Sequence, residues 1–142
     1  MRWGRFQEIA ARRPTGQTLT EFVLGASVFL LVLFAIIEMA IVVFDYNTIS
    51  YAARQATRYA AALGPNSPTP ATNAQIQQVA IGAAPGVALT NSDVAVSWVT
   101  DPNLSTREDA KVTITYPTTV SIPFTTTVVL NLTSTSQMMA SQ

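Results

Sequence analysis

An apolar run from Phe22 to Phe44 is the strongest constraint on how this chain of 142 residues folds. Of its 23 residues 20 are apolar, and Glu38 is its one ionisable side chain. As a helix the run would be about 35 Å long, which exceeds the roughly 30 Å hydrocarbon core of a bilayer. The chain length allows one small domain, which cannot surround so long an apolar helix. Residues 22–44 are therefore predicted to span a membrane.

The charges on either side of the run predict its orientation. Residues 1–16 carry four arginines and one glutamate, a net charge of +3, whereas residues 17–142 carry −3. Basic residues close to a span are retained in the cytoplasm. We therefore expect a single-pass protein of the inner (cytoplasmic) membrane, with a cytoplasmic N-terminus and an exported C-terminal part. An ordinary secretory signal is disfavoured, because its apolar core has only about 7 to 15 residues.

Residues 45–63 predict that the helix continues beyond the membrane. Small and apolar side chains recur there at every third or fourth position, whereas Arg54 and Arg58 fall on another face. The helix is expected to end at Gly64 and Pro65, since Gly takes the left-handed cap and Pro cannot continue the ladder. The recurring residues are Ile49, Ala53, Ala56, Ala60 and Leu63. This narrow stripe suits packing against a helix of another chain or against the sheet of the same chain.

The exported residues 64–142 are predicted to form a small domain. A Pro-rich loop and a short helix come first, and apolar residues then alternate with polar ones. The alternation predicts strands at 94–99, 112–116, 120–122 and 128–132. So small a sheet, with no disulfide or metal, would be marginally stable alone and needs the helix. The expected fold class is α+β, with a long helix over 17–63 packed on a small antiparallel sheet.

The composition also limits the chemistry of the chain. It has no Cys and no His, which excludes disulfides, thiol catalysis and imidazole general bases. No Gly-rich phosphate loop occurs, and the four basic residues outside residues 1–16 are scattered, so a nucleic-acid site is not expected. We expect a protein that is not an enzyme, with no catalytic residue, metal or cofactor.

The segment before the apolar run resembles a class III signal sequence. It reads Arg12-Arg13-Pro14-Thr15-Gly16-Gln17-Thr18-Leu19-Thr20-Glu21-Phe22, a basic leader followed by a Gly, four uncharged residues, an acid and an aromatic. Prepilin peptidase cuts such leaders directly after the Gly. The resemblance implies that Gly16 ends the leader, that Gln17 becomes the mature N-terminus, and that Glu21 takes the fifth mature position, followed by Phe22.

Two further segments are similar to the TadE-like proteins (TadE/TadG family) of the tight-adherence (Flp) type IV pilus system. They are Ala52-Ala53-Arg54-Gln55-Ala56-Thr57-Arg58-Tyr59-Ala60-Ala61 and the strand sequence Val112 to Pro117. The resemblance implies a pilin-like fold and a minor pilin or pseudopilin, with the prepilin peptidase, other pilin subunits and the assembly platform as partners. It also implies an oligomer formed through the N-terminal helix, in the membrane or extracellular in a pilus. Many relatives have a Pro within the apolar run, where this chain has Ala26-Ser27.

Four charged residues are candidate assembly residues. Glu21 favours the start of a helix as the acid of a capping box with Thr18, and the resemblance adds a pairing with the α-amino group of a neighbouring subunit. Glu38 would lie near the outer headgroups, either as an interfacial acid or as an inter-subunit contact. Arg54 and Arg58 are either solvated or paired with the sheet or another subunit. The alternatives to a minor pilin are a major subunit of a pilus-like filament and an uncleaved membrane-anchored envelope scaffold.

Overall fold

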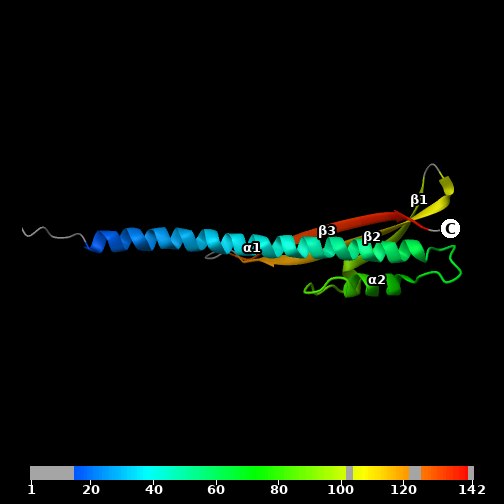
Figure 1. The fold of residues 1–142 in the computed structure, drawn as a ribbon, viewed down its shortest axis with the longest axis horizontal. Helices are drawn as coiled ribbons and strands as arrows, with labels where there is room; N and C mark the ends of the chain where they lie inside the picture. The colour runs from blue at the N-terminus through cyan, green and yellow to red at the C-terminus, as the bar shows by residue number, and fades with distance from the viewer. Residues whose placement is uncertain (1–14, 102–103, 122–125, 141–142) are drawn as a thin grey trace, which may run out of the picture.

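The computed structural model describes residues 15–101, 104–121 and 126–140. One long helix, α1, runs the length of the molecule, and a sheet and a short helix, α2, lie against its C-terminal half (Figure 1). The N-terminal half of α1 extends alone beyond the rest of the fold for most of its length. This is the expected α+β arrangement of a long apolar helix and a small antiparallel sheet.

Helix α1 spans Thr15–Ala62, which makes it about 72 Å long. Polar side chains inside it bond to the helix itself: the Thr20 and Ser27 hydroxyls each donate to the carbonyl oxygen four residues earlier, at 2.8 Å. The expected capping box is not at the helix start, because Thr18 already lies within α1. The helix ends before Gly64-Pro65, as the sequence predicts.

The sheet has three antiparallel strands in the order β1-β2-β3. They are β1 (Val94–Asp101), β2 (Leu104–Val120) and β3 (Val128–Met139). The expectation of separate strands at 112–116 and 120–122 was wrong, because β2 runs continuously through Pro117. Pairing with β1 ends at Ile114, so Pro117 lies where one edge of β2 has no neighbouring strand. A missing N–H is tolerated at such an edge.

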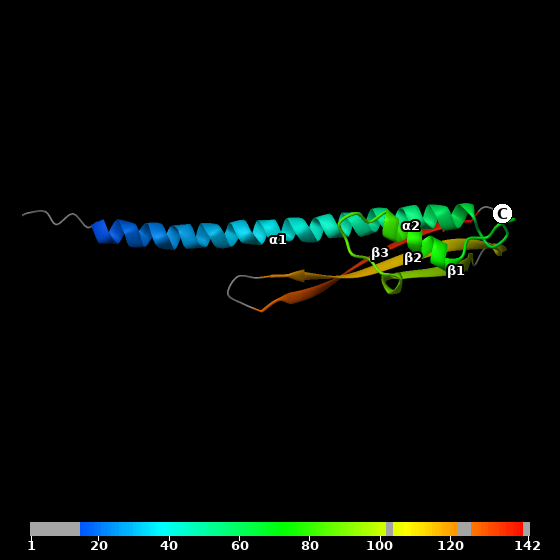
Figure 2. The same ribbon diagram turned by 90° about the horizontal axis from the view of Figure 1, so that it is seen from below.

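The core lies between the outer half of α1, the sheet and α2. Helix α2 (Asn73–Gly82) is capped by Thr72, whose hydroxyl accepts a hydrogen bond from the Gln75 backbone N–H. Both α2 and the sheet contact α1, as Figure 2 shows from a second side. Most of the buried α1 residues are alanines, which allow the other elements to approach the helix closely. The fully buried side chains include Ile49, Ala52, Ala53, Ala56, Ala60, Ile76, Val112 and Ile114.

The β2–β3 hairpin extends further along α1 than β1 does. Beyond Ile114 the pairing continues between β2 and β3 alone, from Thr115↔Thr133 to Val120↔Val128. This two-stranded ribbon runs beside α1 toward its N-terminal half (Figure 2). The sheet and the predicted span therefore overlap along the helix axis.

Replacing Ala56 with Leu should destabilise the docked domain, because the side chain of Ala56 is fully buried in this core. Added methylenes in a packed core cost about 1 to 3 kcal/mol. The change is measurable as a lower unfolding midpoint of the full chain in detergent. Ala62→Leu, at an exposed position near the end of the same helix, is the matched control and should leave the midpoint unchanged. Equal midpoints for the two variants would contradict the assigned packing.

Candidate functional site

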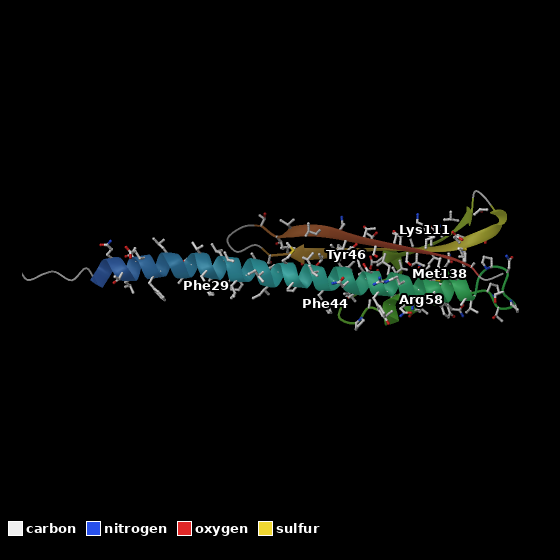
Figure 3. The ribbon with its side chains drawn as sticks, turned by 45° about the horizontal axis from the view of Figure 1, so that its top comes forward. Phe29, Phe44, Tyr46, Arg58, Lys111 and Met138 are labelled. Atoms are coloured by element: carbon white, nitrogen blue, oxygen red, sulfur yellow. The ribbon has the colours of Figure 1, made fainter. Side chains whose placement is uncertain are left out.

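The candidate site is the N-terminal half of α1, which carries its apolar side chains outward. Residues 16–44 are exposed except for Ala26, Glu38 and Val42, which are half-buried. Phe22 is 72% exposed, and Figure 3 shows Phe29 and Phe44 projecting from the helix. Within the described ranges, α1 is the one helix that is long and apolar enough to cross a membrane. An apolar surface of this size on a single helix needs lipid or other subunits to cover it.

Gly16, Gln17 and Glu21 lie in the first two turns of α1. The Gln17 side-chain amide donates a hydrogen bond of 3.2 Å to a Glu21 carboxylate oxygen, so these residues share one face of the helix. A Cβ added at Gly16 would meet no atom within 4 Å, and its φ is not positive. The described fold therefore gives no steric reason for a glycine at this position. The leader before it, residues 1–14, lies outside the described residues.

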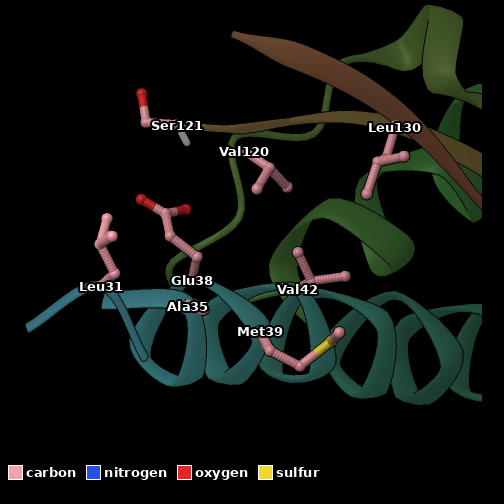
Figure 4. Close-up of a pocket in the computed structure, with 8 residues that line it drawn as sticks. All are labelled: Leu31, Ala35, Glu38, Met39, Val42, Val120, Ser121 and Leu130. Atoms are coloured by element: carbon pink, nitrogen blue, oxygen red, sulfur yellow. The ribbon is translucent and has the colours of Figure 1, made fainter. Parts of the chain in front are cut away.

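The side chain of Glu38 projects from α1 into the space between this helix and the end of the β2–β3 hairpin. It lines a cavity of about 390 Å³ together with apolar side chains of both elements (Figure 4). Its carboxylate points from the helix toward the end of β2, on the side of Ser121. Within the described part of the chain it has no hydrogen-bond or ion-pair partner. The remaining lining residues are Leu31, Ala35, Met39, Val42, Val120, Ser121 and Leu130.

A buried hydrogen bond joins the hairpin to the helix directly after the apolar run. The Thr118 hydroxyl of β2 donates to a carboxylate oxygen of Asp45 on α1 at 2.9 Å, and both side chains are buried. A second tie lies further out, where the Thr57 hydroxyl contacts the Ser136 carbonyl oxygen at 3.3 Å. Sequence reasoning missed the role of Asp45, because nothing in the alternating pattern of β2 distinguishes Thr118 from the other threonines.

Arg54 and Arg58 lie on the exposed face of the outer half of α1, apart from Glu21 and Glu38. Arg54 borders a shallow polar groove with Ser50 and the β3 residues 134–137. Arg58 projects from the helix surface (Figure 3). Neither guanidinium makes an ion pair or hydrogen bond with any residue that the structure describes. Their charge is therefore available to solvent or to another subunit.

The described residues offer no cluster of acidic side chains for metal binding. Among residues 15–101, 104–121 and 126–140, no three acidic side chains come together in a way that could hold a metal ion. The features that the fold does assemble are an exposed apolar helix half, its flanking acids and a domain docked on the other half. Together they define a protein anchored by one helix that is suited to the membrane.

Comparison with known proteins narrows this class. Residues 16–58 match the model of the family described as TadE-like protein, which confirms the predicted resemblance over most of α1. The match begins at Gly16 and includes Glu21, Glu38, Arg54 and Arg58. The similarity noted at Val112 to Pro117 lies outside the matched segment. No curated protein and no solved structure matches the chain. The family suggests involvement in assembly of the Tad pilus.

Removing the Thr118 hydroxyl should weaken the attachment of the hairpin to α1. In a Thr118→Val variant the buried Asp45 carboxylate loses its donor, which costs about 1 to 3 kcal/mol of unfolding free energy. Urea unfolding of the full chain in detergent measures the loss. Thr119→Val makes the same change at the neighbouring exposed position and should be near neutral. A Thr118→Val protein as stable as the Thr119→Val protein would contradict a stabilising role for this bond.

Proposed function

We propose that this protein is a non-catalytic minor pilin or pseudopilin that takes part in assembly of a tight-adherence (Flp/Tad) type IV pilus after prepilin-type leader cleavage. The observation that carries the proposal is the division of α1 into two halves within a TadE-like match. The outer half is packed against the sheet, whereas the half at residues 16–44 is apolar and exposed. A subunit of this form can leave the membrane without unfolding its exported domain.

The exposed half of α1 supplies the assembly surface in this proposal. Moving an apolar helix from lipid into a bundle of similar helices exchanges one apolar environment for another, so the hydrophobic effect contributes little. Packing and polar contacts then determine which helices associate and in what register. Phe22 contributes apolar surface at the start of this segment, where it is 72% exposed.

Glu21 provides the polar contact in this account. Cleavage after Gly16 would leave an α-amino group on Gln17, one turn from Glu21 on the same helix face. A carboxylate at the edge of a bilayer is costly unless it is paired, and the α-amino group of a neighbouring subunit is a suitable partner. Glu38, Arg54 and Arg58 are proposed as further inter-subunit contacts, since none has an ion-pair partner in the described part of this chain.

The proposed location follows from the same helix. The family and the single apolar helix support a single-pass membrane protein. The four arginines of residues 1–16 favour a cytoplasmic N-terminus in the inner membrane and an exported domain that reaches the cell exterior in a pilus. The proposed partners are the prepilin peptidase, other pilin subunits and the assembly platform. A major subunit of a filament and an uncleaved envelope scaffold are the competing functions.

Leader processing is tested by the intact mass and N-terminal sequence of the protein recovered from membranes of its native host. The proposal predicts a chain that begins at Gln17. The control is the same protein from cells that lack prepilin peptidase activity, which should begin at Met1. A chain that still begins at Met1 in the native host would favour the uncleaved scaffold. Abundance in sheared filaments separates a minor subunit from a major one.

A Glu21→Gln variant tests the assembly role of the carboxylate. The substitution keeps the shape of the side chain but removes its charge, so incorporation into sheared filaments should fall several-fold at an unchanged membrane level. Glu8→Gln makes the same change in the leader, which cleavage removes, and should have no effect. Normal incorporation of the Glu21→Gln protein would restrict Glu21 to a role within its own helix.

A further inference from the structure

The end of the β2–β3 hairpin departs from the pattern of the rest of β3. From Asn131 to Gln137 the residues that face away from α1 are polar, and the half-buried residues on the helix side are Leu132, Ser134 and Ser136. The alternation stops at Val128–Leu130, where both faces of the strand are apolar. Val129, on the face turned away from α1, is 59% exposed. A strand that is apolar on both faces is usually covered on both faces.

Contacts with α1 determine where this apolar end lies along the helix. The bond between Thr118 and Asp45 places the middle of the ribbon level with the last residues of the apolar run. Further along, Val120 and Leu130 line the cavity that also contains Glu38 (Figure 4). From Asp45 to Glu38 the helix rises by about 10 Å. The described end of the hairpin therefore lies beside the outer part of the predicted span.

Aromatic side chains mark the same level of α1. Phe44 and Tyr46 are 54% and 48% exposed, and both are labelled in Figure 3 next to the point where the hairpin meets the helix. Tyr and Trp gather where a bilayer meets water, because their rings are amphipathic. Between Gly16 and Tyr46, α1 carries three acidic side chains, Glu21, Glu38 and Asp45, and no basic one. The outer boundary of the bilayer is expected near Tyr46.

We propose that the apolar end of the hairpin, formed by Val120, Val128, Val129 and Leu130, inserts into the outer boundary of the same bilayer that α1 spans. Lipid acyl chains then cover Val129. The proposal rests on the membrane placement given under Proposed function. Lipid is the occupant because the hairpin end has no described charge apart from Glu38 beside it and lies at the level of the span.

The free strand edges limit the depth of insertion. Beyond Ile114 the ribbon has an unpaired edge on β2, and backbone groups at such an edge need water or headgroups. Insertion by about 5 to 10 Å, as for other interfacial segments, keeps these groups within reach of the polar boundary. Because the helix and the hairpin would enter the same bilayer side by side, α1 could no longer rotate freely about its own axis.

Single cysteine labels test the insertion directly, because the natural chain has no Cys. Val129→Cys and Thr135→Cys lie on the same face of β3, about 20 Å apart. Each full-length variant is labelled with bimane and reconstituted into phosphatidylethanolamine and phosphatidylglycerol vesicles. The proposal predicts that iodide quenches the label at position 129 several-fold less than the label at 135. Lipids that carry a quencher just below the headgroup should quench position 129 preferentially.

A third variant separates failure of this proposal from failure of the membrane placement. Val28→Cys, two turns inside the apolar run, should be protected from iodide whenever α1 spans the bilayer. Protection at 28 with full iodide access at 129 would overturn the hairpin insertion alone. Iodide access at both positions would overturn the membrane placement as well. Protection at 129 that disappears as the protein is diluted in lipid would show that a second copy, and not lipid, covers the hairpin.

Discussion

One uninterrupted helix in two surroundings is the constraint on which the rest of this structure depends. A helix satisfies its backbone hydrogen bonds internally, so α1 can pass from lipid to water without a change of secondary structure. What changes along it is the side chains: residues 16–44 are mostly apolar and exposed, whereas beyond Ile49 the face toward the sheet and α2 is small and buried. The first half can therefore exchange lipid for other subunits, while the second half holds a folded domain.

The alanines of the outer half allow that domain to pack closely against the helix. Ala52, Ala53, Ala56 and Ala60 are fully buried, and they bring the helix close to β2, where Val112 and Ile114 complete the core. Two polar contacts, Thr118 to Asp45 and Thr57 to Ser136, join the sheet to the helix at separate levels. The docked domain is thus a sheet and a short helix built on α1, and its position along α1 sets its distance from the apolar half of the helix.

The sequence predicts the local features of this fold well and the non-local ones poorly. The apolar run, the alanine stripe and the Gly64-Pro65 stop define α1, because each depends on neighbouring residues. The alternation of apolar residues predicts the sheet, but it also predicts a strand end at Pro117 that would divide β2 into two strands. In the structure β2 continues through Pro117, because its pairing with β1 has already ended at Ile114. The capping box at Thr18 fails because the helix begins earlier. No local pattern indicates that Thr118 lies level with Asp45, so the overlap of hairpin and span required the structure. The candidate cleavage residues Gly16 and Gln17 and the candidate assembly residue Glu21 were predicted from a resemblance, and the TadE-like match covers residues 16–58.

The central claim is that α1 stays continuous through the membrane boundary with the sheet docked rigidly on its outer half. It is tested most directly by the distance between spin labels at Val28→Cys and Thr135→Cys, measured by double electron–electron resonance on the full chain in lipid vesicles. The account predicts one narrow distance distribution, the same at every protein-to-lipid ratio. A broad or bimodal distribution would contradict it, because the sheet would then move independently of the helix on which it is docked.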